Sequence, residues 1–225
     1  NSLPDSGGSI YLREGTYIVS GQITISKSNV TIVGAGASTV IKIRDNLNTG
    51  IYVIYASGKV NLLIQDLRID GNKANQTSGI MYGIYLNGVV YSKITDCWVE
   101  GNRQHGIILW SSNNNTVTGN TCQGNGQHGI FVYDSSYNNT VTGNTCQGNI
   151  CDGICVGWNV GNNTVTGNTC TGNVNHGISL WAVSNNNTVS GNTCQGNGQD
   201  GIQLEHSSNN TVTGNTCQGN GQNGI

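Results

Sequence analysis

The stretch NTVTGNTCQGNGQHGI at residues 115–130 recurs, with few changes, four more times before the end of the sequence. The copies begin at Asn139, Asn163, Asn187 and Asn210, and their cysteines are 24, 24, 24 and 23 residues apart. A fixed period of this length is typical of a solenoid, in which each repeat forms one coil stacked on the previous one. The sequence therefore predicts a stacked-coil architecture.

Each repeat carries the pattern of three short strands and three corners. In the first copy we expect strands in the Thr-Val-Thr segment, around Cys122, and at 129–133, where inward and outward residues alternate. Gly119 and Asn120 indicate a tight corner, because glycine and asparagine best tolerate a left-handed backbone. Three strands per 23 or 24 residues describe an all-β, right-handed parallel β-helix of about eight or nine coils.

The whole sequence fits this reading. We expect residues 1–225 to form a single parallel β-helix domain, with irregular opening coils at 1–60 and regular repeats at 61–225. The sequence stops inside a strand that earlier repeats complete, and we expect it to be part of a longer chain or to stack on neighbouring chains.

Stacking should place equivalent residues in vertical columns. Three apolar columns are expected to line the core, and they are led by Ile84, Leu86 and Ile64. A fourth column begins with Ile69 and Val99 and continues with the five repeat cysteines, Cys122, Cys146, Cys170, Cys194 and Cys217. Cysteine thus replaces aliphatic residues on a buried wall, which predicts free thiols. The corner residues Asn120, Asn144, Asn168, Asn192 and Asn215 predict an asparagine ladder that begins at Asn120.

Charge and hydropathy exclude several classes of partner. Only 9% of the residues are charged and the formal net charge is -2, whereas nucleic-acid binding requires a basic stripe. There is no run of about 18 apolar residues to span a bilayer, and few long charged side chains are present to form an amphipathic membrane helix. We therefore expect no nucleic-acid partner and no membrane insertion.

Two segments resemble a known superfamily. LPDSGGSIYLREGTYIVSGQITISKSNVTIVGAGASTVI at 3–41 is similar to the opening coils of pectate-lyase-like right-handed β-helix proteins, and the NNTVTGN…GI repeats resemble the NosD-type repeats of that superfamily. The superfamily includes tailspikes, polysaccharide lyases and mannuronan epimerases, so the resemblance implies a β-helix that acts on polysaccharides. No catalytic motif of these families is present. The Tyr-Gly-Phe-Asp-Pro-His-Glu-like segment of the epimerases is absent, as are the paired aspartates of the polygalacturonases and the calcium-binding nonapeptide.

An aromatic strip is the first candidate site. Outward positions of the Gly-Ile strands form two columns, and the predicted substrate-binding residues on or beside them are Tyr85, Trp110, Phe131, Tyr133, Trp158 and Trp181. Sugars present apolar C–H faces that stack on exposed rings, and successive coils would space such rings along an extended glycan. In the families that this chain resembles, the same strand lines the substrate groove. The alternative is that aromatic residues simply favour strands.

The residue before each Gly-Ile pair gives the second candidate. His128, Asp152, His176 and Asp200 follow His105 in one column and are the candidate catalytic residues, because histidine and carboxylate side chains can transfer protons. Against this, Arg103 is the only basic residue after Lys93 that could neutralise a uronate carboxylate. A turn position that accepts any polar residue is the alternative, and the column's orientation relative to the aromatic strip is not fixed by the sequence.

The cysteine spacing and the Asn-x-Thr sequons give little information about the function. Cys151 and Cys155 resemble half of a metal site, but no second pair lies at zinc spacing, so we predict no metal and no cofactor. A Cys151–Cys155 disulfide remains open. Asn-x-Thr sequons begin at Asn29, Asn75, Asn114, Asn138, Asn162, Asn186 and Asn209, and they give only weak support for secretion.

Two functions from different classes fit the sequence. In the first, the protein is an extracellular or cell-surface β-helix that binds or processes a polysaccharide on the outward face of the Gly-Ile strands. If it is an enzyme, it would be a lyase, an epimerase or a glycoside hydrolase. In the second, it is a non-catalytic sheath, stem or adhesin built by repeat stacking and by end-to-end or lateral self-association. The near-uniform repeats favour the second function, and the aromatic strip favours the first.

Overall fold

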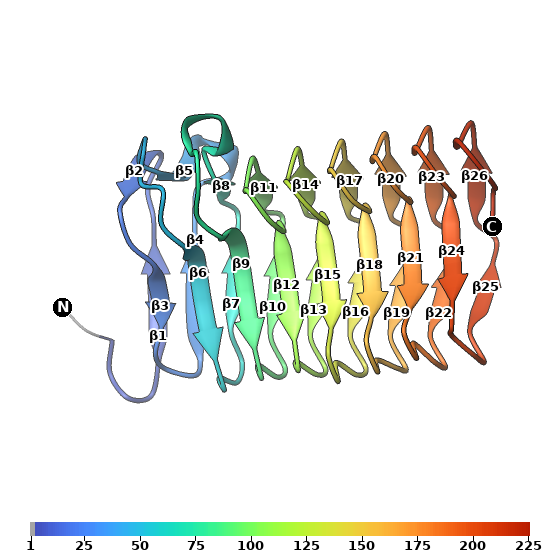
Figure 1. Ribbon diagram of the computed structural model, residues 1–225. Helices are drawn as coiled ribbons and strands as arrows, with labels where there is room; N and C mark the ends of the chain where they lie inside the picture. Colours follow the sequence, from blue (N-terminus) through green and yellow to red (C-terminus); the bar gives the residue numbers. More distant parts are fainter. Residues whose placement is uncertain (1–2) are drawn as a thin grey trace.

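The chain winds into nine coils stacked along one axis in the computed structural model, which describes residues 3–225 (Figure 1). Each strand pairs in parallel with the equivalent strand of the next coil, so the coils share three sheets. The predicted all-β parallel β-helix is therefore confirmed. Within residues 3–225 no helix has the length and apolar character that crossing a bilayer requires.

Three strands from each coil build the three sheets. Sheet A contains β1 (Gly8–Tyr11), β4 (Val30–Val33), β7 (Leu63–Gln65), β10 (Lys93–Thr95), β13 (Thr116–Thr118), β16 (Thr140–Thr142), β19 (Thr164–Thr166), β22 (Thr188–Ser190) and β25 (Thr211–Thr213). Sheet B contains β2 (Gly15–Val19), β5 (Thr39–Ile43), β8 (Arg68–Asp70), β11 (Trp98–Glu100), β14 (Thr121–Gln123), β17 (Thr145–Gln147), β20 (Thr169–Thr171), β23 (Thr193–Gln195) and β26 (Thr216–Gln218). Sheet C contains β3 (Ile23–Ile25), β6 (Ile51–Ser57), β9 (Met81–Asn87), β12 (Ile107–Trp110), β15 (Ile130–Tyr133), β18 (Ile154–Gly157), β21 (Ile178–Trp181) and β24 (Ile202–Glu205).

The register of these sheets confirms the predicted columns. Ile130 pairs with Ile154 in sheet C, Val117 with Val141 in sheet A, and Cys122 with Cys146 in sheet B. The inward side chains of all three sheets form one buried apolar core along the axis. Because each coil buries few apolar residues of its own, it is stable only when it packs against the adjacent coils.

The cysteines are unpaired, as predicted. The structure shows all eight as free thiols, and the repeat cysteines of the inner coils are fully buried in sheet B. Cys151 and Cys155, whose pairing the sequence left open, are not bridged. Burial raises the pKa of the Cys146 thiol well above its ordinary value, so this thiol is a neutral side chain that fills space in the core.

Asparagine ladders close the corners between the strands. The predicted ladder is confirmed from Asn120 to Asn215, and Asn120 Oδ1 also accepts the backbone N–H of Cys97 at 3.0 Å in the coil below. Gly119 has the expected left-handed φ of 66°, whereas Asn120 contributes its side-chain amide rather than a left-handed backbone. Two further ladders were not predicted, and they contain Asn115, Asn139, Asn163, Asn187 and Asn210, and Asn102, Asn125, Asn149, Asn173, Asn197 and Asn220.

The repeated sequons have a structural explanation. Their first asparagines, such as Asn138 and Asn162, adopt left-handed φ values of 58° and 57°, which asparagine tolerates better than most residues. The second asparagine of each pair, such as Asn139 and Asn163, supplies a ladder amide. The Asn-Asn-Thr pattern therefore follows from the corner geometry alone.

The second and third coils differ from the rest in their insertions, one of which lies after residue 61, where the sequence predicted regular repeats. Short 3₁₀ turns, η1 (Gly36–Ser38) and η2 (Lys73–Asn75), interrupt them. The second turn belongs to a loop between β8 and β9 that stands above the neighbouring corners (Figure 1). This loop leans over the outer face of sheet B, where it closes a polar cleft described below.

Candidate functional site

The outer face of sheet C carries the predicted aromatic strip. In β15 the side chains of Ile130 and Val132 enter the core, so Phe131 and Tyr133 point outward. The register places Phe131 beside Ile108 and Tyr133 beside Trp110 in the preceding coil. Alternation along the strand and register between strands thus bring residues that are distant in sequence onto one surface.

Five of the predicted residues form one row of rings. Their ring centroids follow one another at 6.2 Å from Tyr85 to Trp110, 4.8 Å to Tyr133, 6.3 Å to Trp158 and 5.9 Å to Trp181. Trp158, which follows β18 with a left-handed φ of 68°, bridges the gap at Gly157. Trp110 and Trp158 are the most exposed members, at 36% and 53%.

Tyrosines from the second and third coils lengthen this row. Tyr52 and Tyr55 of β6 pair with Tyr82 and Tyr85 of β9, and the Tyr52 ring lies 4.6 Å from that of Tyr85. Sequence reasoning missed three of the four, although IYVIYA at 51–56 and MYGIYL at 81–86 share their pattern. Burial, followed by the neighbouring tyrosines, raises the pKa of Tyr85, so its hydroxyl stays protonated.

The other outward column is covered rather than exposed. Ile108, Phe131 and Cys155 form a small apolar cluster on the outside of sheet C, and Phe131 is only 9% exposed. Tyr133 and Trp181 pack over this cluster. Phe131 therefore supports the rings above it, and its contact with a ligand would be limited to its exposed edge.

A cavity of about 230 Å³ opens between the rings at the start of the row. The rings of Tyr52, Tyr82 and Trp110 contribute to its lining, together with Ile108 and Phe131. Its volume is below the range of about 300 to 1,000 Å³ that is usual for ligand pockets, so it suits a small group rather than a whole polymer. The row and this cavity together define the candidate site.

The His/Asp column lies on the same outer face, which the sequence did not settle. His105 stacks on His128 with 5.0 Å between ring centroids, and both rings lie 4.9 Å from Phe131. The backbone N–H of Asp152 donates to His128 Nδ1 at 3.2 Å, and the backbone N–H of His176 donates to Asp152 Oδ1 at 3.0 Å. The column is thus a fourth side-chain ladder, in which histidine and aspartate replace asparagine.

Burial shapes the protonation of this column. Desolvation and the neighbouring His128 lower the pKa of His105 to about 3, so its imidazole is neutral. Burial alone would raise the pKa of Asp152, but its contacts with His128, Ser179 and the backbone N–H of His176 outweigh burial and lower it. Asp152 is therefore an ionised carboxylate inside the outer face.

The one basic residue expected near this site is engaged elsewhere. Arg103 Nη1 donates to the carbonyl of Gln76 at 2.6 Å, and its Nε donates to the carbonyl of Gly79 at 3.2 Å. These bonds hold Arg103 against the loop that precedes β9. The geometry of the aromatic row therefore suits ring stacking better than charge neutralisation.

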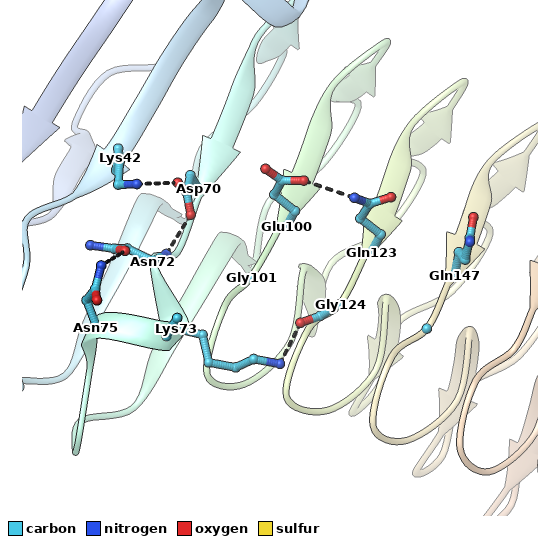
Figure 2. A pocket seen from close by; sticks show the side chains of 12 residues that line it. Lys42, Asp70, Asn72, Lys73, Asn75, Glu100, Gly101, Gln123, Gly124 and Gln147 are labelled. Atoms are coloured by element: carbon cyan, nitrogen blue, oxygen red, sulfur yellow. Dashed lines mark hydrogen bonds and ion pairs between the residues drawn. The ribbon is translucent and has the colours of Figure 1, made fainter.

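A second, polar cleft has a volume of about 660 Å³ and lies on the outer face of sheet B. Figure 2 shows the side chains that line it. Its central column contains Lys42, Asp70, Glu100, Gln123 and Gln147, which are register partners from coil to coil. Sequence reasoning did not find it, because these residues are separated by 23 to 30 positions and have different chemical types. Their equivalent position in sheet B was the signal that could have shown it.

Every carboxylate in this cleft already has a partner. Lys42 Nζ lies 2.9 Å from Asp70 Oδ2, and Gln123 Nε2 donates to Glu100 Oε2 at 3.1 Å. Lys73 reaches across the corner to donate to the carbonyl of Gly124 at 2.6 Å (Figure 2), and burial lowers its pKa. The cleft can donate and accept hydrogen bonds, but it offers no exposed ring on which a sugar could stack.

Comparisons with known proteins agree with the fold. The family described as "Right handed beta helix region" matches residues 20–194 and 158–225. The A-module of the mannuronan C-5 epimerase AlgE4 from Azotobacter vinelandii superposes with a TM-score of 0.76 at 20% identity, over 95% of this chain and 70% of that one.

Two curated relatives from Azotobacter vinelandii share local sequence. Mannuronan C5-epimerase AlgE5 is 42% identical over 96 residues, which cover 37% of this chain and 9% of the relative. Alginate lyase 7 is 32% identical over 174 residues, which cover 58% of this chain and 20% of the relative. The chain thus spans a fifth or less of the length of these relatives.

Proposed function

The chain belongs to the right-handed β-helix family, and we propose that it binds an extended polysaccharide along the outer face of sheet C. The continuous row of rings from Tyr52 to Trp181 carries this proposal. Coils about 4.8 Å apart present one ring after another, so a linear glycan lying along the axis would meet a regular series of apolar platforms. Ring stacking needs no charged partner, which fits the engaged state of Arg103.

A polyuronate is the first substrate class to test. The mannuronan epimerases and the alginate lyase that share sequence with this chain are named for such polymers. Because polysaccharides of this kind lie outside the cytoplasm, we propose that the protein acts there. The buried thiols are compatible with this location, since oxidants reach buried cysteines slowly.

Processing of the polymer would require a proton-transfer group beside the row. Within this proposal, His128, Asp152, His176 and Asp200 remain the candidate catalytic residues. His128 is the most accessible of them, whereas the other three are buried and hydrogen-bonded within the ladder. A binding role is favoured over catalysis because the ladder already uses the lone pairs that a general base would need.

Affinity electrophoresis in gels that contain polymannuronate, alginate or a neutral glucan tests the proposal. We expect the wild-type protein to be retarded by one of these polymers, and Trp110→Ala or Trp158→Ala to weaken binding about tenfold per ring. Trp98→Ala is the matched control, because Trp98 is 37% exposed, close to the 36% of Trp110, but belongs to sheet B. Equal retardation of all three variants and the wild type would refute binding at the aromatic row.

A further inference from the structure

The coil formed by β16, β17 and β18 departs from the repeat on the outer face of sheet C. Cys155 occupies the column position of Ile108 and Phe131, and Gly157 occupies that of Trp110 and Tyr133. These changes bring a thiol beside the ladder residues His128 and Asp152. One nitrogen, oxygen or sulfur atom from each of these three side chains lies within 4.8 Å of the others.

We propose that His128, Asp152 and Cys155 form a binding site for a zinc-class divalent cation. Imidazole, carboxylate and thiolate are the three ligand types that zinc takes in proteins, at about 2.0 to 2.3 Å. Ligand atoms in such a tetrahedral site lie about 3.5 Å apart, and His128 Nδ1 is 3.2 Å from Asp152 Oδ2. The widest pair needs to approach by little more than about 1 Å, which side-chain torsions can supply.

A positive charge between His128 Nδ1 and Asp152 Oδ2 would stabilise the arrangement of these two atoms. His128 Nδ1 uses its single lone pair to accept the backbone N–H of Asp152 at 3.2 Å, so an ion bound here would take this lone pair over from the ladder hydrogen bond. Asp152 Oδ2, which faces it, already accepts the hydroxyl hydrogen of Ser179 at 2.7 Å. Two acceptor atoms at this distance repel unless a proton, as in the contact by which His128 lowers the pKa of Asp152, or a metal ion lies between them. The nearby sulfur favours the metal ion, since a proton would make no use of it.

Neighbouring groups hold the ligands in place. Ser179 Oγ and the backbone N–H of His176 each donate to one oxygen of Asp152. Trp181 Nε1–H donates to Cys155 Sγ at 2.9 Å. Trp181 can lie this close because residue 157 is glycine, where a Cβ atom would stand 2.3 Å from Nε1. Such outer hydrogen bonds orient metal ligands and tune their basicity.

Binding of the divalent ion releases one proton and leaves a site without net charge. The thiol of Cys155 is fully buried, and burial, with the charge of Asp152, raises its pKa above the ordinary value. The divalent ion therefore displaces the thiol proton, which leaves to solvent as the metal–sulfur bond forms. Thiolate and carboxylate then offset the two positive charges. The thiolate also favours zinc or cobalt over calcium or magnesium, which prefer oxygen ligands. Because the Cys155 thiol is buried and its pKa is raised, it is a poor nucleophile.

The sequence could not show this site, because its ligands come from two coils. The sequence has no second cysteine pair at zinc spacing, because the remaining ligand is His128 of the coil below. The chain also contains an internal control. His176 Nδ1 lies 3.4 Å from Asp200 Oδ2 in the same geometry, but Gln203 stands where the sulfur would be.

Cobalt titration of the full 225-residue chain under reducing conditions tests the proposal. We expect one equivalent of Co²⁺ to give a thiolate-to-cobalt charge-transfer band, with competition by Zn²⁺ and none by Ca²⁺. Affinity should rise about tenfold per pH unit, because one proton leaves per ion bound. Trp181→Phe should bind about 10- to 100-fold more weakly, since the indole N–H is lost.

Matched variants come from the chain's own repeats. Cys155→Ile copies Ile108 and Asp152→Asn copies the ladder residue Asn223, so both should fold yet lose the band. Cys151→Ser should keep it. Gln203→Cys should add a second, weaker equivalent at His176 and Asp200. A band that survives in Cys155→Ile, or that disappears in Cys151→Ser, would overturn this ligand set, as would the absence of any band in the wild type.

Discussion

Oδ1 of Asn168 accepts two hydrogens from Asn144, one from the backbone N–H at 2.9 Å and one from the side-chain amide at 3.0 Å. Asn144 Oδ1 receives the same pair of bonds from Asn120, and Asn144 Nδ2 also donates to the carbonyl of Val117. The Asn144 side-chain amide therefore satisfies buried groups in both neighbouring coils. Asn144→Ala should lower the free energy of unfolding by about 3 kcal/mol, because it leaves buried backbone groups without partners.

Chemical denaturation of the two variants Asn144→Ala and Asn215→Ala measures this contribution. Asn215 occupies the same column but is only half-buried and lies in the final coil, so its replacement should cost clearly less. Equal losses for the two variants would show that the ladder does not depend on burial.

Acid should destabilise the protein through His105. The pKa of this imidazole is about 3 in the folded protein, below its ordinary value of 6.5, so the unfolded chain binds the proton first as the pH falls. Stability should therefore decrease below pH 6.5, by up to about 1.4 kcal/mol per pH unit. His105→Asn keeps an acceptor for the backbone N–H of His128 and should flatten the pH dependence of unfolding between pH 6.5 and 3. An unchanged profile would contradict the burial of a neutral histidine.

The acid loss should continue through Asp152. Its pKa is lowered in the folded protein, so its ionised form stabilises the fold above the ordinary carboxyl pKa, and this contribution disappears as the pH falls through the lowered value. Asp152→Asn should reduce the pH dependence in that acidic range only. Urea denaturation at a series of pH values separates this effect from that of His105.

Thiol reactivity should divide the eight cysteines into two groups. Cys151 and Cys217 are only partly buried, whereas the others are buried and their thiols are shielded from solvent. A thiol reagent should therefore modify two cysteines in the native protein and all eight after denaturation. The double variant with Cys151→Ser and Cys217→Ser should show no fast reaction. Rapid modification of Cys146 would contradict its place in the core.

The strand pairing and one asparagine ladder could be predicted, because the same residue types recur at the same positions of every repeat. The pairing of Ile130 with Ile154 and the ladder that begins at Asn120 follow from the period of the sequence. The ladder of Asn125 and Asn149 is equally periodic, but glycine and asparagine at this corner also fit an ordinary turn. The hydrogen bond between the asparagines of two successive coils can be identified only from the backbone positions of both residues.

The candidate site on sheet C was less predictable, because it depends on how side chains of different size and type pack against each other. Alternation correctly placed Phe131 outward, yet the rings above cover it. The Cys155 thiol is also outward in the strand pattern, but Trp181 folds over it because residue 157 is glycine. The cleft around Asp70 and Glu100 was missed because its residues share a position rather than a residue type.

Indole resonances provide the most direct test of polysaccharide binding, because the chain has only four tryptophans. Trp110, Trp158 and Trp181 belong to the aromatic row on sheet C, whereas Trp98 lies in sheet B beside Arg68. In ¹⁵N-tryptophan spectra assigned with single Trp→Phe variants, polymannuronate oligosaccharides should shift the three signals of the row and leave Trp98 unchanged. A shift of Trp98 alone, or no shift in the presence of any polysaccharide that retards the protein in gels, would contradict the proposed site.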